Sequence, residues 1–330
     1  MILGIEIGGT KLQLGVGDGD RAHFEAFERY DVKPELGAAG ILSQIKEAGR
    51  SLCDRFDIQR VGFGFGGPVD GAAGRVITSH QIDGWTDCAL VEWVRDTLDV
   101  PASLGNDCDC AALAEARYGA GQGHRTVFYI TVGTGVGGGL VVEQRVHGTD
   151  RPAVAEIGHL RPGLLADDHH ATVESLASGW GIAATARAAL TNEPVRIQDQ
   201  LLPRGRPALT EADRADLLER CGGDANSLTT LMIGEAAAAG NASARKILRT
   251  GTDTLGWAIA QMTAIVAPDV VVIGGGVSLM GDELFLNPIR EAVSRYIFPP
   301  LADACVFTNP QLGEEVVVHG AIALGAQDIR

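Results

Sequence analysis

The stretch VFYITVGTGVGGGLVV, residues 127–142, decides the fold that we predict for this chain. β-Branched and aromatic residues at 126–132 are enough for one buried strand, and residues 140–142 resume as a second strand. The glycine-rich segment between them predicts a hairpin whose tip exposes backbone N–H groups. Such a tip can bind an anion, because glycine permits positive φ and close approach of a phosphate. A flexible hairpin tip without a ligand is the alternative interpretation.

A second glycine-rich hairpin of this kind is predicted near the N-terminus, where residues 2–16 read ILGIEIGGTKLQLGV. An apolar strand runs into a Gly-Gly-Thr turn at 8–10, and alternating apolar residues then follow at 12, 14 and 16. Two phosphate-binding hairpins that face each other across a cleft are suited to hold a nucleoside triphosphate. The pair is a stronger indication than either glycine-rich turn alone.

Composition limits the function classes. The chain has 330 residues, 45% of them hydrophobic, with 44 glycines and few aromatic residues, which fits a two-domain α/β enzyme. The net charge of −15 argues against nucleic-acid and membrane partners. We find neither an apolar window long enough for a membrane span nor a signal-peptide pattern, and therefore expect a cytoplasmic protein.

The six cysteines are scattered, so we expect free thiols. Cys108 and Cys110 flank Asp109 and resemble a ligand pair at first sight. Helical spacing would put them on different faces, and we therefore interpret both as small packed residues.

The order of elements in the first half, β-β-β-α-β-α-β-α, predicts a mixed sheet covered by helices. We expect strands at 23–30, 61–65 and 101–104, helices at 38–56 and 87–98 with Thr86 as N-cap, and a helix that follows 105–107 and ends at Gly119. The second half repeats the plan from Thr126. There we expect a helix at 243–266, a strand at 270–273, a loop at 194–207, a strand at 316–318 and a terminal helix at 321–328.

Six motifs together resemble those of a known family. They are EIGGTK at 6–11, GGPVD at 66–70, GND at 105–107, GTGVGGG at 133–139, EIGH at 156–159 and VIGGGVS at 272–278. In this order, over residues 2 to about 327, they resemble the ROK family of bacterial sugar kinases and sugar-responsive repressors, within the actin-like ATPase superfamily.

The resemblance implies an α/β fold of two actin-like (ribonuclease H-like) domains with a cleft between them. The small domain would comprise 1–120, joined by the C-terminal helix at about 319–330, and the large domain 121–318. The implied activity is that of an ATP-dependent hexose kinase, glucokinase-like, which transfers the γ-phosphate to the 6-hydroxyl of a hexose such as glucose. ATP and Mg²⁺ are the implied cofactors.

The resemblance also assigns the site residues. Asp107 would be the catalytic base that accepts the proton of the sugar hydroxyl, although Asn-Asp before a helix is by itself an ordinary cap. The residues expected to bind the sugar are Gly66, Gly67, Asn106, Asp107, Glu156, His159 and Glu174. The residues expected to bind ATP are Glu6, Gly8, Gly9, Thr10, Lys11, Gly133, Thr134, Gly135, Gly137, Gly274, Gly275 and Gly276, with Mg²⁺ near Glu6. The alternatives are a core histidine at His159, a solvated helix start at Glu174 and a simple tight turn at Gly66-Gly67.

Two departures from the family pattern stand out. Many relatives follow EIGH with a cysteine cluster that completes a structural zinc site, whereas this chain continues LRPGLLADDHHATVES without a cysteine. We therefore expect no structural zinc and a solvated loop at Asp167, Asp168, His169 and His170. The second departure is Glu6, where relatives usually carry Asp. Glu keeps the charge but moves it by one methylene, and we expect the enzyme to remain active.

Two other classes of function stay in view. A repressor would need a helix-turn-helix ahead of the kinase-like part, for which a first loop that begins at Gly4 leaves no room. A catalytically impaired sugar-binding protein would fit Glu6 and the missing cysteines. Fructose, mannose, allose, N-acetylglucosamine and N-acetylmannosamine are alternative substrates, and the wall that selects the sugar is expected partly around 77–85. We expect a homodimer or higher homo-oligomer.

Overall fold

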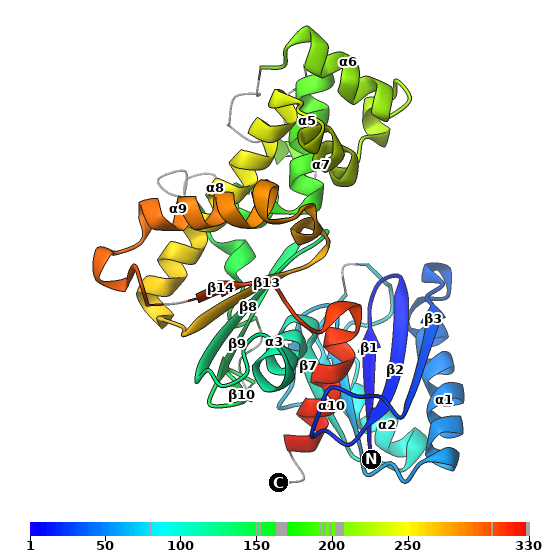
Figure 1. Cartoon of the computed structure of the whole chain (residues 1–330). Coiled ribbons are helices and arrows are strands. Elements are labelled where there is room, and N and C mark those ends of the chain that lie inside the picture. The colour runs from blue at the N-terminus through cyan, green and yellow to red at the C-terminus, as the bar shows by residue number, and fades with distance from the viewer. Residues whose placement is uncertain are drawn as a thin grey trace.

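The computed structural model contains two five-stranded sheets of the same topology (Figure 1). The structure describes residues 1–79, 81–149, 151, 153–162, 170–191, 193, 196–197, 200–201, 208–304 and 306–327. The first sheet has the order β3-β2-β1-β4-β7 and the second the order β10-β9-β8-β13-β14. In each sheet the central strand, β1 or β8, is antiparallel to its hairpin partner on one side. On the other side lie two strands that run parallel to it.

The strands of the first sheet are β1 (Ile2–Ile7), β2 (Lys11–Gly17), β3 (Ala26–Asp31), β4 (Arg60–Phe65) and β7 (Ala102–Asn106). Those of the second are β8 (Thr126–Val132), β9 (Val136–Val142), β10 (Arg145–Val146), β13 (Val270–Gly274) and β14 (Val306–Thr308). The other strands of the described residues form two short pairs: β5 (Val69–Asp70) with β6 (Arg75–Val76), and β11 (Arg196–Ile197) with β12 (Gln200–Leu201). The last pair falls within the loop predicted at 194–207, of which the other residues lie outside the described part.

The described helices are α1 (Gly37–Arg55), α2 (Leu90–Leu98), α3 (Asp107–Tyr118), α4 (Val173–Ala177), α5 (Gly179–Thr191), α6 (Glu211–Arg220), α7 (Thr230–Ala238), α8 (Ala242–Val266), α9 (Asn287–Tyr296) and α10 (Val316–Gln327). Helices α3 and α10 pack on each other in the middle of the molecule (Figure 1). Helix α10 lies on β1 and β4 of the first sheet, and α3 on β8 and β9 of the second. The two helices therefore join the sheets.

Each sheet has its own apolar core. In the first, β1 is buried along its whole length, and the predicted stripe of α1, which includes Ile41, Ile45 and Leu52, packs beneath it. In the second, β8 and β13 pack against the long helix α8. Central strands that are covered on both faces read as continuous apolar runs, which is why the sequence located them.

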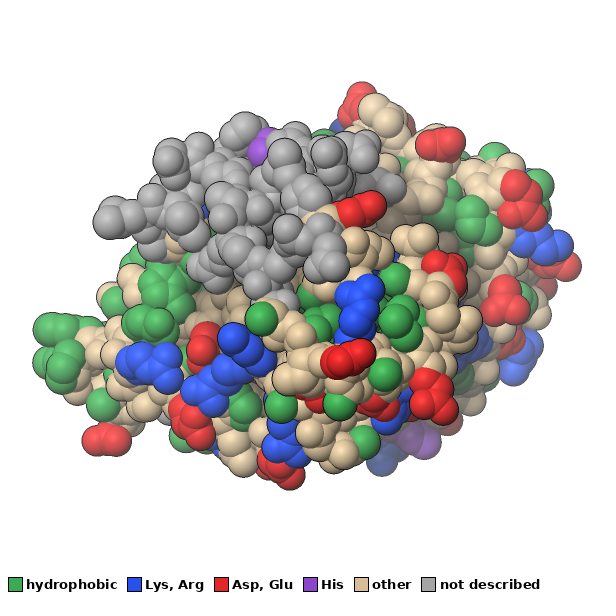
Figure 2. Space-filling view, turned by 90° about the horizontal axis from the view of Figure 1, so that it is seen from above, with side chains coloured by type: hydrophobic (Ala, Val, Ile, Leu, Met, Phe, Trp, Pro, Cys, Tyr) green, Lys and Arg blue, Asp and Glu red, His purple; other side chains and the backbone are tan. Residues whose placement is uncertain are grey.

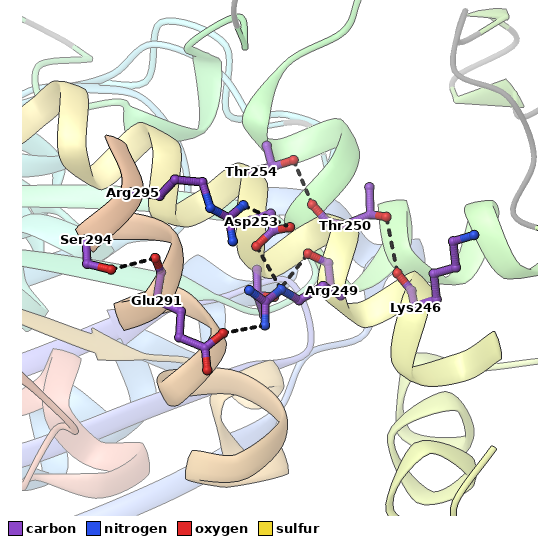
Figure 3. Close-up of polar contacts among 9 residues, drawn as sticks. Lys246, Arg249, Thr250, Asp253, Thr254, Glu291, Ser294 and Arg295 are labelled. Carbon is purple, nitrogen blue, oxygen red and sulfur yellow. Dashed lines mark hydrogen bonds and ion pairs between the residues drawn. The ribbon is translucent and has the colours of Figure 1, made fainter. Parts of the chain in front are cut away.

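Helix α9 is held to α8 by charged side chains (Figure 3). The guanidinium of Arg249 lies 2.9 Å from Asp253 Oδ1 and 2.7 Å from Glu291 Oε2. Arg295 approaches the other oxygen of Asp253 at 3.9 Å. These side chains are partly exposed, so the network adds modestly to a packing that is mainly apolar.

The strand predicted at 316–318 is wrong, because Val316 begins α10. Three consecutive valines favour a strand by propensity, but packing overrides that preference here. A Cβ at Gly320 would clash with the backbone of Cys110, so the missing side chain lets α10 lie directly on α3.

The helix predicted at 87–98 begins later, at Leu90, and Thr86 is not its cap. Asp87 has a φ of 53° and pairs with Arg75, whose Nε lies 2.7 Å from its carboxylate. This pairing keeps Asp87 in the preceding loop.

The five described cysteines are free thiols, as expected. Cys108 and Cys110 are buried, and their sulfurs lie beside Gly137 and Gly64, respectively. Both are therefore packing residues, as the sequence predicted. Cys305 lies outside the described residues.

Candidate functional site

A cleft of about 370 Å³ lies where the two sheets approach each other. Glu6 and Lys11 reach it from the first sheet, Tyr129 and Thr131 from the second, and Asp107 from the start of α3. It therefore collects ionisable side chains that are far apart in the sequence. Ligands bind at such positions in α/β proteins, where strands end and glycine turns begin.

Asp107 is the first residue of α3 and directly follows the end of β7. The side chain of Asn106 caps the helix: its Oδ1 accepts from the Cys108 N–H at 2.7 Å, and its Nδ2 donates to the Gly67 carbonyl at 2.9 Å. The Asp107 carboxylate accepts from the same N–H at 2.8 Å. Burial raises the pKa of Asp107 above its ordinary value. A carboxylate that prefers to take up a proton is suited to general-base chemistry.

Glu6 lies in the same cleft and is 7% exposed. Burial raises its pKa to about 7, and Lys11, whose Nζ lies 3.5 Å from Glu6 Oε1, opposes this shift. The second oxygen, Oε2, is buried without a hydrogen-bond partner among the described residues. One side of this carboxylate is therefore available to a ligand or to a movable side chain.

The first glycine turn is closed by a bond from the Gly8 N–H to the Lys11 carbonyl, at 3.0 Å. The argument from positive φ is wrong for both hairpins, because none of their glycines adopts a left-handed conformation. Close approach accounts for some of them instead, since a Cβ at Gly139 would lie 2.5 Å from the Cys108 carbonyl oxygen. A Cβ at Gly9 would overlap the side chain of Gln81, and Thr10 beside it is exposed at the tip.

The second glycine hairpin is held by its surroundings. The Gly133 carbonyl accepts from the Gly179 N–H at 2.8 Å, and Glu174 Oε2 accepts from the Val136 N–H at 2.9 Å. A Cβ at Gly135 would lie 2.5 Å from that Glu174 oxygen. A Cβ at Gly133, in contrast, would meet no described atom within 4 Å, so packing does not explain the glycine there.

A larger cavity, of about 800 Å³, adjoins the cleft. Gly276 and Leu279 line both spaces, so the two are neighbours. The residues of its wall include Gly133, Thr134, Trp180, Thr230, Leu231, Val277, Met280 and Leu284. Sequence reasoning missed Trp180, Leu231 and Met280, because an apolar side chain at helical spacing gives no sign that it faces a cavity rather than the core.

The glycines at 274–276 play different parts. Gly275 has a φ of 90°, and a Cβ on it would meet the Val132 carbonyl oxygen at 2.5 Å. Gly276 opens into both cavities. Gly274 ends β13 with the hydroxyl of Tyr129 close by. The structure thus brings Gly275 and Gly276 to the cleft, with Gly274 one residue behind.

Several of the residues expected to bind the sugar lie near Asp107. Gly66 lies beside the Asp107 carboxylate, and Glu156 lines a narrow space together with Asn106. Burial raises the pKa of Glu156, while His159 lowers it. His159 ends a short 3-10 turn and is exposed, so the alternative of a core histidine is wrong.

Asp109 is a further acidic residue of this cluster that sequence reasoning treated only as a spacer. It lines the narrow space with Glu156. Burial, and then the charges of Asp107 and Glu156, raise its pKa to about 7. Asp109 follows Asp107 by two residues and therefore lies on another face of α3, so no signal for its role was present in the sequence.

No group of three or more His, Cys, Asp or Glu side chains is placed to hold a metal among the described residues. The segment 163–169, which includes Asp167, Asp168 and His169, lies outside them, so the absence of zinc stays a prediction. No described helix is both long and apolar enough to cross a membrane. The face in Figure 2 mixes acidic and basic side chains over its described part.

Comparison with known proteins agrees with this geometry. The ROK family model matches residues 2–328, and the chain belongs to the ROK family. It is 28% identical to a glucokinase of Streptomyces coelicolor, over 99% of this chain and 98% of the relative. It is 30% identical to a glucokinase of Halalkalibacterium halodurans, over 96% and 92% of the two chains.

Among solved structures, a ROK family glucokinase from Streptomyces griseus in complex with glucose and AMPPNP superposes with a TM-score of 0.76. The identity is 29%, over 99% of each chain. The predicted fold class, two α/β units of the actin-like ATPase type, is thereby confirmed. The domain boundaries at 1–120 and 121–318 stay a prediction, as do the roles of the individual site residues.

Proposed function

We propose that this protein is an ATP-dependent sugar kinase that phosphorylates the 6-hydroxyl of glucose or a closely related hexose. The observation that carries the proposal is the partly buried Asp107 carboxylate, which shares one cleft with Glu6 and Lys11. Similarity to proteins named glucokinase supports the substrate class. The solved relative with glucose and AMPPNP supports ATP as the donor.

The nucleotide would extend across both cavities. The larger one, with Trp180 and Met280 in its wall, has the apolar character that a purine requires. The phosphates would then point into the cleft, toward the ammonium group of Lys11. On the opposite side, backbone N–H groups of the second hairpin near Thr134 would donate to phosphate oxygens.

The donor set of the cleft fits Mg²⁺. Carboxylate oxygens are hard ligands, and Glu6 Oε2 is a buried oxygen without a hydrogen-bond partner among the described residues. Glu6 would hold the ion through water, together with the phosphates. The ion supplies neutralisation of the charge on the transferring phosphoryl group.

Asp107 would accept the proton of the attacking sugar hydroxyl as the hydroxyl oxygen bonds to the γ-phosphorus and the bond from that phosphorus to ADP breaks, so that ADP leaves. Phosphoryl transfer depends mainly on alignment and charge neutralisation, so the other residues orient the sugar. Asn106 keeps its turn in place through Gly67 and would offer its amide to a hydroxyl. Glu156, His159 and the remaining oxygen of Glu174 would accept from the other hydroxyls.

The test is a coupled ADP-release assay over a panel of glucose, mannose, fructose, allose, N-acetylglucosamine and N-acetylmannosamine. We expect release with Mg²⁺ and ATP that depends on the sugar and is greatest for glucose. A larger kcat/KM for another sugar of the panel would reassign the substrate. A protein that binds sugar and ATP but releases no ADP would be the catalytically impaired binder. Homo-oligomeric assembly and a cytoplasmic location stay predictions.

A further inference from the structure

A polar row crosses the first sheet beneath the cleft. Arg29 of β3 lies opposite Gln13 of β2, and Gln13 lies opposite Glu6 of β1. The next position in the row is Gly64 of β4, which carries no side chain. Glycines two residues along β1 and β2 touch Val318, so this face of the sheet points toward α10.

Gln13 is an unusual residue for such a position. It is 0% exposed, and its Nε2 has no hydrogen-bond partner among the described residues. The same holds for Oε2 of Glu6, directly opposite. A buried donor and a buried acceptor on paired residues, both unsatisfied, are costly unless some state of the protein joins them.

Lys11 explains why they are separate in this state. Its Nζ lies 3.5 Å from Glu6 Oε1, 3.4 Å from Gln13 Oε1 and 3.5 Å from the Glu314 carbonyl oxygen. The ammonium group therefore serves both side chains of the pair. The proposed function, on which this inference rests, requires Lys11 to turn toward the phosphates and so to leave Glu6.

We propose that Gln13 is a positioning residue. Its side-chain amide forms a hydrogen bond with the Glu6 carboxylate in place of Lys11 when Lys11 turns to the nucleotide. Its Nε2 then donates to one lone pair of Glu6 Oε2, which anchors the carboxylate in the cleft, and Oε1, which Lys11 has left, can face the water shell of the ion. Directly opposed residues have Cβ atoms about 4.5–5.5 Å apart, which is within reach of these two equally long side chains.

No other side chain of the row serves as well. The guanidinium of Arg29 is 53% exposed and pairs with Glu314 Oε2 at 3.4 Å, at the outer end of the row. Gln13 lies between it and Glu6. The amide is neutral, so it holds the carboxylate without competing with the phosphates for Lys11.

The consequence is measurable as nucleotide affinity. Without Gln13, the departure of Lys11 would leave a buried carboxylate with fewer donors, and the nucleotide would bind less tightly. We expect Gln13→Met to raise the Kd of Mg·AMPPNP about tenfold by isothermal titration calorimetry. The Kd of adenosine should stay unchanged, because a ligand without phosphates leaves Lys11 where it is.

Two further proteins separate this role from general packing. In a Glu6→Met background the additional change Gln13→Met should have no further effect on AMPPNP affinity, since there is no carboxylate to hold. Leu14→Met changes a buried residue on the opposite face of β2 and should bind AMPPNP like the wild type.

The wild-type protein gives an independent signature. The ¹⁵N–¹H resonances of the Gln13 side-chain amide should shift on addition of Mg·AMPPNP and not on addition of adenosine. Equal AMPPNP affinities of Gln13→Met and wild type, or no shift of these resonances, would overturn the proposal that Gln13 replaces Lys11 at Glu6. The proposed sugar kinase activity would be unaffected by that result. Wild-type protein that binds no AMPPNP would contradict the proposed function itself, and with it the proposed role of Gln13.

Discussion

The two glycine hairpins look alike in sequence, but in the structure they differ in their charged side chains and in the contacts that hold them. The first, at 7–11, carries Glu6 and Lys11 at its base and is backed by the buried Gln13. The second, at 132–136, has no charged residue of its own, and it is held from outside by Glu174 and by the start of α5. The two sheets behind them share one topology.

The difference suggests a division of labour. The first hairpin would supply mobile charge to the phosphates, and the second would supply fixed backbone donors. A mobile lysine needs a partner that replaces it when it moves, whereas a fixed N–H group needs only a rigid frame. The following variants test this division, from the largest expected effect to the smallest.

Asp107 lies between the hairpins and belongs to neither. Asp107→Asn should lower kcat by about 10² or more, because the attacking hydroxyl loses its proton acceptor. Nucleotide affinity should change little, since both hairpins are intact, and the melting temperature should not fall, because burial disfavours the carboxylate that is removed. ADP release and calorimetry measure these quantities. Turnover near the wild-type value would remove Asp107 from the role of base.

Glu6 tests the charged hairpin. Glu6→Asp restores the residue usual in the family and should stay within about tenfold of wild-type kcat, a barrier change of about 1.4 kcal/mol. Glu6→Gln should lose more and require more magnesium, because it removes the fixed charge. A magnesium titration of both variants measures the difference. If wild type and Glu6→Gln behave identically across it, the side chain has no part in metal binding.

Two alanine substitutions test the uncharged hairpin. Gly133→Ala meets no described neighbour, so it should leave the melting temperature unchanged and raise the KM for ATP about tenfold by filling phosphate space. Gly135→Ala displaces Glu174 from the Val136 N–H and should destabilise the fold by about 1–2 kcal/mol. Thermal unfolding and ATP titrations separate the two effects. An unchanged KM in Gly133→Ala would mean that no phosphate lies there.

Asp109 tests the acidic cluster that it forms with Asp107 and Glu156, through pH. Its pKa rises from 3.8 to about 7 on folding, so its contribution to stability is present below about pH 4 and is lost as the pH rises through 7. Asp109→Asn should therefore stabilise the protein more at pH 8 than at pH 5, by about 1–3 kcal/mol. Urea unfolding at the two pH values measures this. Asp96→Asn, at an exposed position of α2, controls for the loss of one charge, and an equal gain in both variants would contradict the assignment.

Zinc should have the smallest effect. Purified protein should contain no stoichiometric zinc, and a zinc chelator should leave its melting temperature unchanged. One equivalent of zinc by elemental analysis, lost together with stability on chelation, would show that a replacement site exists.

The sequence predicted the sheets well because their central strands are buried on both faces. The consecutive valines of β13 and the alternation of apolar residues in β2 are both typical of strands. It failed at Val316, where a strand-like run is a helix because α10 must fill the space between α3 and the first sheet. It also missed β14, which has only three residues and owes its pairing to β13.

For the site, the sequence located the motifs but not their partners. Asp107 and Glu6 were predictable because the motifs contain them. Trp180, Gln13 and Asp109 were not, since their significance comes from what lies opposite in space: a cavity, an unsatisfied carboxylate and a second acidic side chain. The neighbours of Gly9 and Gly135 were also inaccessible, because Gln81 and Glu174 are far away in the sequence.

The most direct test is whether both hairpins hold the same nucleotide. Hydrogen–deuterium exchange with mass spectrometry, with and without Mg·AMPPNP, reports on the backbone N–H groups at 8–11 and 133–136 separately. Protection of both segments at one saturating concentration is the expected result, with adenosine alone protecting neither. Protection of only one hairpin, or of neither while AMPPNP is bound, would contradict a triphosphate held between the two sheets.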